Sequence, residues 1–494
     1  MCHLYLRFLT SLSLLVVALT ANAQITILHD FGSVANDGSN PHTPLLLEGS
    51  TLFGTTLAGG EFGSQGALFS IGTNGSGYDL EHSFFTSTSG MDPIGTLAID
   101  GTTLYGTTEF GGATAPFTGT VYSIGTDGSS PNILHEFDGG ASDGARPAGG
   151  ILRIGSTLYG ITSEGGDDNF GTIFSIGTNG TGFTLLHEFA GDPNDGSTPT
   201  ASLIFADGKL FGTTQGGGED SLGILFSIDP NGSNYTVVHE FVEDINFERP
   251  DGAFPEGIVA DGSTIYGVTN EGGADESGII YKINTNGTGF SVIHEFEDGV
   301  STNGSFPSGA LAVSGTTLVG TTNFGGASEE GTVFSLETDG TDFQVLHSFA
   351  GGTEDGSDPR TQVTIDGSTI LGTTSGGGDF GAGTIFSLPL GGGTLFREAD
   401  FNEDTFVDEV DLSIWEAAYA TNDTADADGD GDSDGADFLI WQQQFGLPPL
   451  LSVTRTAVPE PCALGLFVSL ALGLSLCGRR RYDLLTHEPN SSPA

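Results

Sequence analysis

The sequence predicts an all-β fold: a seven-bladed β-propeller of four-stranded antiparallel blades over residues 24–396. The segment from Leu158 to Phe189 recurs in recognisable form seven times, and the His-x-Phe motif that closes each copy returns every 52 to 55 residues. The chain also contains 80 glycines and 10% aromatic residues, a composition that favours many short strands joined by tight turns. Four apolar runs in a repeat of this length are typical of a propeller blade.

Each repeat carries four sequence markers. A Gly-x-x-Pro turn precedes the first apolar run, an LYGTT-like motif begins the second, an aromatic ring lies in the third, and His-x-Phe closes the fourth. In chain order, the prolines are Pro41, Pro93, Pro147, Pro199, Pro255, Pro307 and Pro359; the second runs begin at Leu52, Leu104, Leu158, Leu210, Ile265, Leu318 and Ile370; the rings are Phe69, Tyr122, Phe174, Phe226, Tyr281, Phe334 and Phe386; and the histidines are His29, His82, His135, His187, His239, His294 and His347.

The order of the runs predicts that the ring is closed by the N-terminal strand. The chain begins with a fourth run around His29, before the first complete set of four. No histidine-containing copy of that run follows Phe386. We therefore expect the N-terminal strand to complete the last blade and to pair the edges that an open array would expose.

The repeated histidines are predicted to be structural. Strand alternation in the run FTLLHEF places Phe183, Leu185, His187 and Phe189 on one face. We expect a buried, hydrogen-bonded histidine between blades rather than a metal ligand, because the outermost strands are spread around a wide rim. The Asn-Gly turns before these strands include the sequons at Asn74, Asn179, Asn231 and Asn286, and we expect these asparagines to adopt positive φ.

The loops between second and third strands are acidic and contain aromatic residues. They are expected on the same face as the blade-to-blade loops. Their notable residues are Glu61, Phe62, Glu109, Phe110, Asp167, Asp168, Phe170, Glu219, Asp220, Asp275, Glu276, Phe324, Glu329, Asp379 and Phe380. Carboxylates interleaved with exposed rings suit sugar stacking or Ca²⁺-assisted glycan contact, and the alternative is a set of solvated loops on a halotolerant surface. No isolated acid–base pair or nucleophile breaks the sevenfold pattern, so the sequence supports no catalytic residue.

The charge balance excludes some partners. With 12 Lys and Arg against 64 Asp and Glu, the formal net charge is −52, which would repel nucleic acids and anionic membrane surfaces. Such a charge favours solubility and is also typical of proteins in salt or outside the cell. Cys2, Cys462 and Cys477 lie in the two terminal apolar segments, so no disulfide is expected in the body.

Residues 397–447 differ in composition and predict a paired calcium-loop module. Two twelve-residue loops are each followed by an apolar helical pattern, LSIWEAAY and FLIWQQQF. Oxygen ligands fall at Asp400, Asn402, Asp404, Phe406 (carbonyl), Asp408 and Asp411 in the first loop, and at Asp426, Asp428, Asp430, Asp432 (carbonyl), Asp434 and Asp437 in the second. Six or seven oxygens on one short loop suit Ca²⁺. Gly431 provides the sharp turn in the second loop, whereas Thr405 occupies that position in the first.

The two ends predict export. Residues 1–23 combine a basic start, an apolar stretch and the ending Ala21-Asn22-Ala23, as in a secretory signal peptide; the alternative is an uncleaved anchor helix. After a linker at 448–457, residues 458–481 contain Val458-Pro459-Glu460-Pro461, a short apolar segment and Arg479-Arg480-Arg481, with a cytoplasmic tail at 482–494. The arginines would remain on the cytoplasmic side, and a single-span tail anchor is the alternative to a removable signal.

Three resemblances extend this interpretation. Residues 25–396 resemble the tandem Gloeo/Verruco (GloVer) repeats of bacterial surface proteins. The two calcium loops, each followed by a helix, resemble a type I dockerin module of the EF-hand kind, which implies a cohesin partner. The C-terminal motif resembles a PEP-CTERM sorting signal, which implies recognition by an exosortase, although the tail after the arginines is longer than usual.

These features favour a non-catalytic, calcium-binding surface or matrix protein, whose propeller is a binding or scaffold module with glycans as the candidate ligands. The alternatives are a dockerin-bearing component of polysaccharide breakdown, with an extracellular polysaccharide as partner, and a propeller hydrolase or lyase.

Overall fold

The computed structural model describes residues 25–390, except 64, 86–88, 113–116, 192, 244–248, 298–302 and 354. The chain divides into two units, residues 1–394 and 395–494, and all described residues belong to the first. The predicted signal peptide, calcium-loop module and sorting signal lie outside the described residues, and their predictions stay predictions. Within the described residues, no helix is long and apolar enough to cross a membrane.

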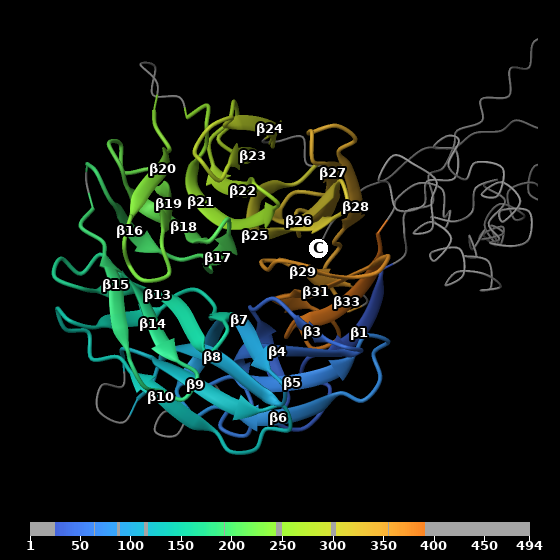
Figure 1. Cartoon of the computed structure of the whole chain (residues 1–494). Coiled ribbons are helices and arrows are strands. Elements are labelled where there is room, and N and C mark those ends of the chain that lie inside the picture. Colours follow the sequence, from blue (N-terminus) through green and yellow to red (C-terminus); the bar gives the residue numbers. More distant parts are fainter. Residues whose placement is uncertain are drawn as a thin grey trace, which may run out of the picture. The chain divides into compact units, whose positions relative to one another are not determined.

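The described residues form seven antiparallel blades around one axis, and blade 7 consists of a four-stranded sheet and the separate two-stranded sheet of β29 and β32 (Figure 1). Blade 1 contains β2 (Gly38–Pro41), β3 (Leu46–Glu48), β4 (Thr51–Gly59), β5 (Ala67–Gly72) and β6 (Asp79–Ser83); blade 2 contains β7 (Met91–Asp100), β8 (Thr103–Phe110), β9 (Thr120–Gly125) and β10 (Asn132–Glu136); blade 3 contains β11 (Gly144–Pro147), β12 (Leu152–Ile154), β13 (Thr157–Gly165), β14 (Thr172–Gly177) and β15 (Thr184–Glu188); and blade 4 contains β16 (Gly196–Pro199), β17 (Ile204–Ala206), β18 (Lys209–Gly217), β19 (Ile224–Ile228) and β20 (Thr236–Glu240).

The remaining three blades follow the same order. Blade 5 contains β21 (Ala253–Asp261), β22 (Thr264–Glu271), β23 (Ile279–Asn284) and β24 (Ser291–Glu295); blade 6 contains β25 (Ser305–Ser314), β26 (Thr317–Phe324), β27 (Thr332–Glu337) and β28 (Gln344–Ser348); and blade 7 contains β29 (Gly356–Ser357), β30 (Thr364–Asp366), β31 (Thr369–Thr374), β32 (Gly376–Gly377), β33 (Thr384–Pro389) and β1 (Thr26–Asp30). The innermost strand is continuous in blades 2, 5 and 6 and divided into two segments in the others.

The predicted closure is confirmed. β1 pairs antiparallel with β33, with Thr26 opposite Ser387 and Asp30 opposite Thr384. Blade 7 therefore takes its outermost strand from the start of the described chain. Its β33 strand, which would otherwise be an unpaired edge, is covered by β1.

The core lies between neighbouring blades, and a repeated glycine makes room for it. The Gly of each LYGTT-like motif faces the aromatic ring of the third strand. At Gly160 an added Cβ would lie 2.5 Å from Phe174, and the other six blades have the same close approach. Only glycine fits here without moving the ring.

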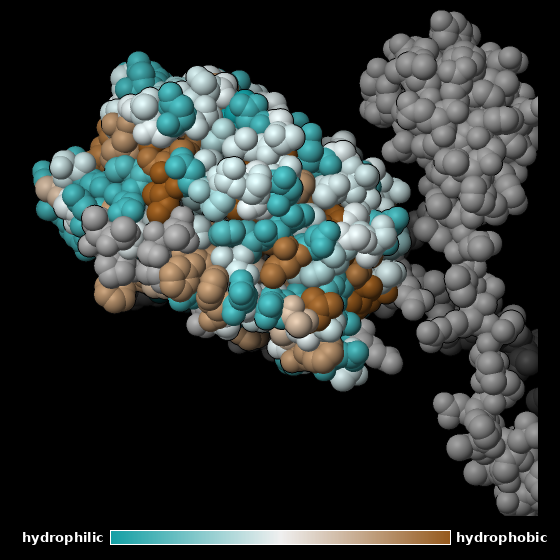
Figure 2. All heavy atoms as spheres, turned by 90° about the horizontal axis from the view of Figure 1, so that it is seen from below, coloured by the Kyte–Doolittle hydropathy of each residue, from teal (hydrophilic) through white to brown (hydrophobic). Residues whose placement is uncertain are grey.

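Viewed from one edge, the surface is mostly hydrophilic or of intermediate hydropathy, and its hydrophobic residues form separate patches (Figure 2).

The prediction for the outermost strand needs a correction. A register shift at Leu186 in β15 interrupts the alternation, because Ile173 pairs with His187 and Phe174 pairs with Leu185. Phe183 therefore stacks on His135 of blade 2, whereas His187 stacks on Tyr235 of blade 4. The four residues do not share one face, since the bulge turns the strand over between Leu185 and His187.

The histidines are hydrogen-bonded to the blade-to-blade loops in five of the seven copies. The ring nitrogen Nε2 of His29, His135, His187, His239 and His347 lies 3.0 to 3.2 Å from Asp37, Asp143, Asp195, Asp251 and Asp355, respectively, and that of His82 lies 3.0 Å from the Ser89 hydroxyl. Each Asp or Ser follows its histidine in the blade-to-blade loop. The prediction of hydrogen-bonded structural histidines is confirmed for the other five copies, whereas Nε2 of His239 and Nε2 of His294 have no hydrogen-bond partner among the described residues.

The Asn-Gly turns are present, but the predicted backbone is wrong. Positive φ belongs to the following glycines, such as Gly180 with φ 78°, and not to the asparagines. The Asn179 side-chain oxygen instead accepts hydrogen bonds from the backbone N–H and the hydroxyl of Thr181. The sequon asparagines are therefore side-chain caps of the turns.

Candidate binding site in the central channel

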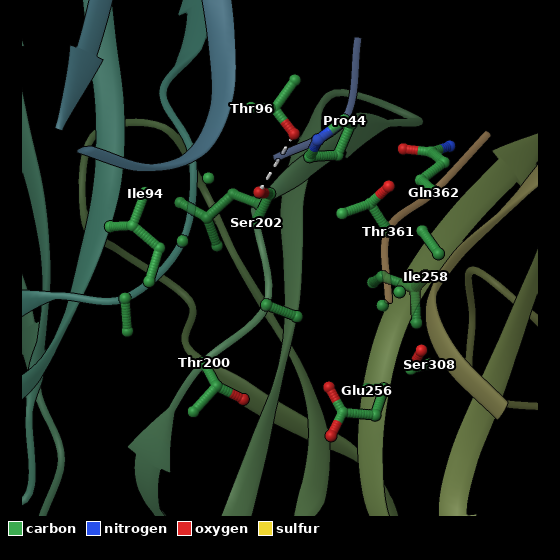
Figure 3. A pocket seen from close by; sticks show the side chains of 18 of the residues that line it. Pro44, Ile94, Thr96, Thr200, Ser202, Glu256, Ile258, Ser308, Thr361 and Gln362 are labelled. Carbon is green, nitrogen blue, oxygen red and sulfur yellow. Dashed lines mark hydrogen bonds between the residues drawn. The ribbon is translucent and has the colours of Figure 1, made fainter. Parts of the chain in front are cut away.

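The innermost strands of all seven blades surround a cavity of about 630 Å³ on the propeller axis. The volume falls within the range of small-molecule sites, roughly 300–1,000 Å³. The side chains of Thr200 and Glu256 point into this cavity, and Ser202 and Thr96 lie on its wall (Figure 3).

One position per blade gives the cavity its chemical character. The residue directly after the repeated proline lines the cavity in every blade, and it is different in every blade. In order these residues are His42, Ile94, Ala148, Thr200, Glu256, Ser308 and Arg360, named below the channel ring. This set departs from the sevenfold pattern at one equivalent position in every blade, and it includes an acid, Glu256, and a histidine, His42. Aligning the seven Gly-x-x-Pro turns by their prolines would have revealed it in the sequence.

Glu256 is a half-buried acid in this wall. Its Oε1 accepts a hydrogen bond of 3.0 Å from the Gln215 amide, and its backbone carbonyl accepts one of 2.8 Å from the Thr213 hydroxyl. Burial raises the pKa of the Glu256 carboxyl, although the bond from Gln215 partly offsets that rise. Glu256 can therefore act as a hydrogen-bond donor at a higher pH than an exposed glutamate.

His42 has the opposite shift. Burial lowers the pKa of the His42 imidazole, and the positive charge of Arg360 lowers it further, while Asp358 and Glu109 act in the other direction. Nδ1 of His42 has no hydrogen-bond partner among the described residues, and the same holds for the hydroxyl of Thr200. Buried polar atoms nearly always have a partner, so these two atoms can serve a ligand.

A second set of residues forms the rim of the channel. These are the residues directly before the repeated prolines, with φ between 54° and 58°: Asn40, Asp92, Arg146, Thr198, Phe254, Phe306 and Asp358, named below the rim ring. In each blade the backbone N–H of this residue donates a hydrogen bond to a carbonyl in the preceding blade, as from Phe306 to Ser277 and from Arg146 to Thr118. The backbone role is the same seven times, while the side chains differ.

Three arginines near the rim of the channel form ion pairs with carboxylates. Arg146 contacts Glu109 at 2.5 Å and Glu164 at 3.2 Å, and its guanidinium lies 4.9 Å from the centre of the Phe110 ring. Arg249 contacts Glu271 at 2.6 Å, and Arg360 contacts Asp358 at 2.7 Å. Because carboxylates neutralise these arginines, the channel mouth does not favour an anionic ligand.

The loop residues predicted from sequence lie on the face of the propeller that contains the rim, because β2 pairs with the end of β4 that precedes the second-to-third loop. The predicted loop carboxylates outside the strands and the rings of Phe62, Phe170, Phe324 and Phe380 are exposed, as expected. Phe110 and Glu109 are partly buried beside Arg146. No group of three or more His, Cys, Asp or Glu among the described residues is placed to hold a metal ion.

Taken together, fold and site define a closed seven-bladed propeller with an axial pocket lined by both polar and apolar residues. The family model of the Gloeobacter/Verrucomicrobia repeat matches residues 62–263 and 244–412, more than half of the chain. The protein therefore belongs to this repeat family, and the resemblance to GloVer repeats is confirmed. A search of curated protein sequences finds no significant match.

Several solved structures are similar in fold. An oligogalacturonate lyase from Vibrio parahaemolyticus has 13% identity and a TM-score of 0.48, over 75% of this chain and 94% of that one. An oligogalacturonate lyase in complex with manganese has 11% identity and a TM-score of 0.47, over 75% and 93% of the two chains. A chain of a nidogen/laminin complex has 14% identity and a TM-score of 0.36, over 59% and 92%.

Proposed function

We propose that this protein is a non-catalytic glycan-binding protein whose propeller holds a neutral sugar unit in the axial cavity. The observation that carries the proposal is the channel ring: seven cavity-lining positions differ in every blade, while the framework around them repeats. If these positions only supported the fold, equivalent blades would be expected to use equivalent residues.

The chemistry of the cavity favours a hydroxylated neutral ligand. Thr200, Ser308 and the carboxyl of Glu256 offer both donors and acceptors, and Ile94 and Ile258 offer apolar surface. A sugar ring has apolar C–H faces and hydroxyl edges, which suits such a mixture. The pairing of the nearby arginines argues against a phosphate, sulfate or uronate group.

Catalysis is the second candidate, and one observation favours it. Glu256 and His42 line the same cavity, and their pKa values are shifted in opposite directions. Such a pair is a common arrangement of a general acid and a general base. A hydrolase or lyase would use these two residues, whereas a binding module needs only their hydrogen bonds.

A glycan array with and without Ca²⁺, run beside a turnover assay on the same polysaccharides, tests the proposal. Binding without product is the expected result. Product formation that is lost in Glu256→Gln would instead establish the catalytic alternative. Absence of binding to any neutral glycan would overturn the proposed function.

We further propose that the chain is exported, with its calcium-loop module between the propeller and the C-terminal sorting segment. The ligand spacing over residues 400–411 and 426–437 supports Ca²⁺ binding. Because metal binding and folding are coupled in such loops, adding EDTA to residues 397–447 should remove the helical circular dichroism signal. A signal that does not change would contradict the calcium proposal.

The module also offers a route to a different role, as a docking segment in polysaccharide breakdown. Capture of the full chain by a cohesin domain, lost when Asp426 and Asp430 are replaced by Ala, would support that alternative. Without such capture, the module is better explained as a Ca²⁺-stiffened spacer.

A further inference from the structure

The rim ring is built from residues that are unfavourable for their backbone conformation. All seven have φ between 54° and 58°, the left-handed region in which glycine is the least costly residue. The chain contains 80 glycines, yet none of them occupies these seven positions. Since the backbone hydrogen bond to the preceding blade needs no side chain, the side chains are retained for another reason.

The rim side chains divide into two arcs. Blades 7, 1, 2, 3 and 4 contribute polar residues, namely Asp358, Asn40, Asp92, Arg146 and Thr198. Blades 5 and 6 contribute Phe254 and Phe306. Around the channel, the aromatic arc therefore faces the polar arc (Figure 1).

Beside the aromatic arc, the ring of Phe324 is available for stacking, whereas Phe254 of the arc is engaged by an arginine. The guanidinium of Arg249 lies 5.7 Å from the centre of the Phe254 ring. The ring of Phe306 meets that of Phe324 edge-to-face, with centroids 5.9 Å apart and an interplanar angle of 89°. Phe324 is 49% exposed, and its chain neighbour Asn323 lines the cavity. An edge-to-face contact from Phe306 holds the Phe324 ring in place beside the channel mouth.

We propose that the ligand is a glycan chain rather than a single sugar, with one unit in the channel and the next stacked on Phe324, which Phe306 supports. This inference rests on the proposed function, because the channel unit fixes the end of the chain. An exposed ring that packs on Phe306, near a pocket with hydroxyl and carboxyl groups, suits the C–H face of a neutral sugar. The acidic surface around it excludes an anionic chain.

The test is a calorimetric titration of the full chain with one- to six-unit oligosaccharides of glucose, galactose, mannose, xylose and N-acetylglucosamine. We expect affinity for the preferred sugar to rise about tenfold from one unit to three. Phe324→Ala and Phe306→Gly should each remove most of that increase and leave the affinity for one unit within about twofold. These magnitudes match a single stacking contact.

Two controls keep the result interpretable. Phe306→Gly relieves an unfavourable φ, so it should keep the thermal stability of the native chain while it loses affinity. Phe205→Ala removes an exposed ring of 44% exposure from β17, at the opposite end of blade 4, and should change nothing. If wild type binds one sugar unit and three units with equal affinity, the chain proposal alone is overturned. The same holds if the Phe variants lose as much affinity for one unit as for three. Failure of every oligosaccharide to bind would overturn the proposed function as well.

Discussion

The two faces of the propeller are built from the same repeats but differ in character. On the face opposite the rim, the third-to-fourth turns repeat one device: Asn74, Asp127, Asn179, Asn231, Asn286 and Asp339 each accept a hydrogen bond from the backbone N–H two residues later. Among the described residues, eight large hydrophobic side chains are exposed: Val34 and six phenylalanines lie on the rim face, and Phe205 lies on the other face.

The difference shows which parts of a repeat the fold specifies. Turn asparagines, motif glycines and inter-blade histidines recur because each blade needs the same contact with its neighbour. The channel ring and the rim ring sit on the same framework, but the channel ring has a different residue in every blade and the rim ring has five residue types in seven blades. The rim face is therefore the part of the molecule where function can differ without loss of the fold.

The largest expected change in the free energy of unfolding comes from replacing the glycine that is repeated in every blade. Gly160→Ala should lower the free energy of unfolding by about 2–3 kcal/mol, because its Cβ would clash with Phe174 and overpack the blade. Gly155→Ala is the matched control: it has positive φ of 62° but no atom within 4 Å of the added Cβ, and should cost about 1 kcal/mol. Denaturant unfolding measures both. Equal losses would mean that the close approach to the ring is not what requires glycine.

The inter-blade histidines predict a pH effect. In blade 1 the usual Asp is replaced by Ser89, and burial lowers the pKa of His82. A histidine held neutral in the folded state contributes stability fully above its unfolded pKa of about 6.5, and this is lost as the pH falls towards the folded pKa. Ser89→Asp should raise the pKa of His82 and stabilise the protein at pH 5 by about 1 kcal/mol relative to wild type.

Thermal melts at pH 5 and pH 8 measure this difference. The double variant His82→Gln/Ser89→Asp is the control, since it lacks the group that titrates. A gain at pH 5 that persists in the double variant would show that the new carboxylate acts on something other than His82.

Much of the framework could be predicted from the sequence, because its markers repeat. The blade number, the closing strand and the structural role of the histidines follow from spacing and order. The bulge at Leu186 could not be predicted, since it depends on pairing with β14 and leaves no mark in the apolar pattern. The exposed loop carboxylates were found by their charge, whereas the channel ring was missed because its residues were compared along the chain and not at equivalent positions.

A smaller effect is expected in the channel ring. Burial raises the pKa of Glu256, so its ionised form opposes folding as the pH rises above the ordinary glutamate value of about 4.5. Glu256→Gln should therefore stabilise the protein at pH 7 by up to about 1 kcal/mol, and the difference should vanish below pH 4. Denaturant unfolding at both pH values tests this. A loss of stability at pH 7 would show that Glu256 serves the fold.

The smallest effect belongs to the turns of the opposite face. Asn179→Ala removes two hydrogen bonds to Thr181 from an exposed turn and should cost about 0.5 kcal/mol. Asp339→Ala should have a similar cost, because the same bonds join Asp339 to Thr341. Thermal melts compare the two variants, and a large cost for only one would break the equivalence of these turns.

The central claim is that the channel ring holds the ligand. Its most direct test is a calorimetric titration of the best-bound neutral oligosaccharide into wild type, the double variant Thr200→Ala/Glu256→Ala, and the opposite-face variant Phe205→Ala. We expect the double variant to lose at least tenfold in affinity, about 1.4 kcal/mol, with its melting transition retained, and Phe205→Ala to bind as wild type does. Unchanged affinity in the double variant would place the ligand elsewhere and contradict the claim.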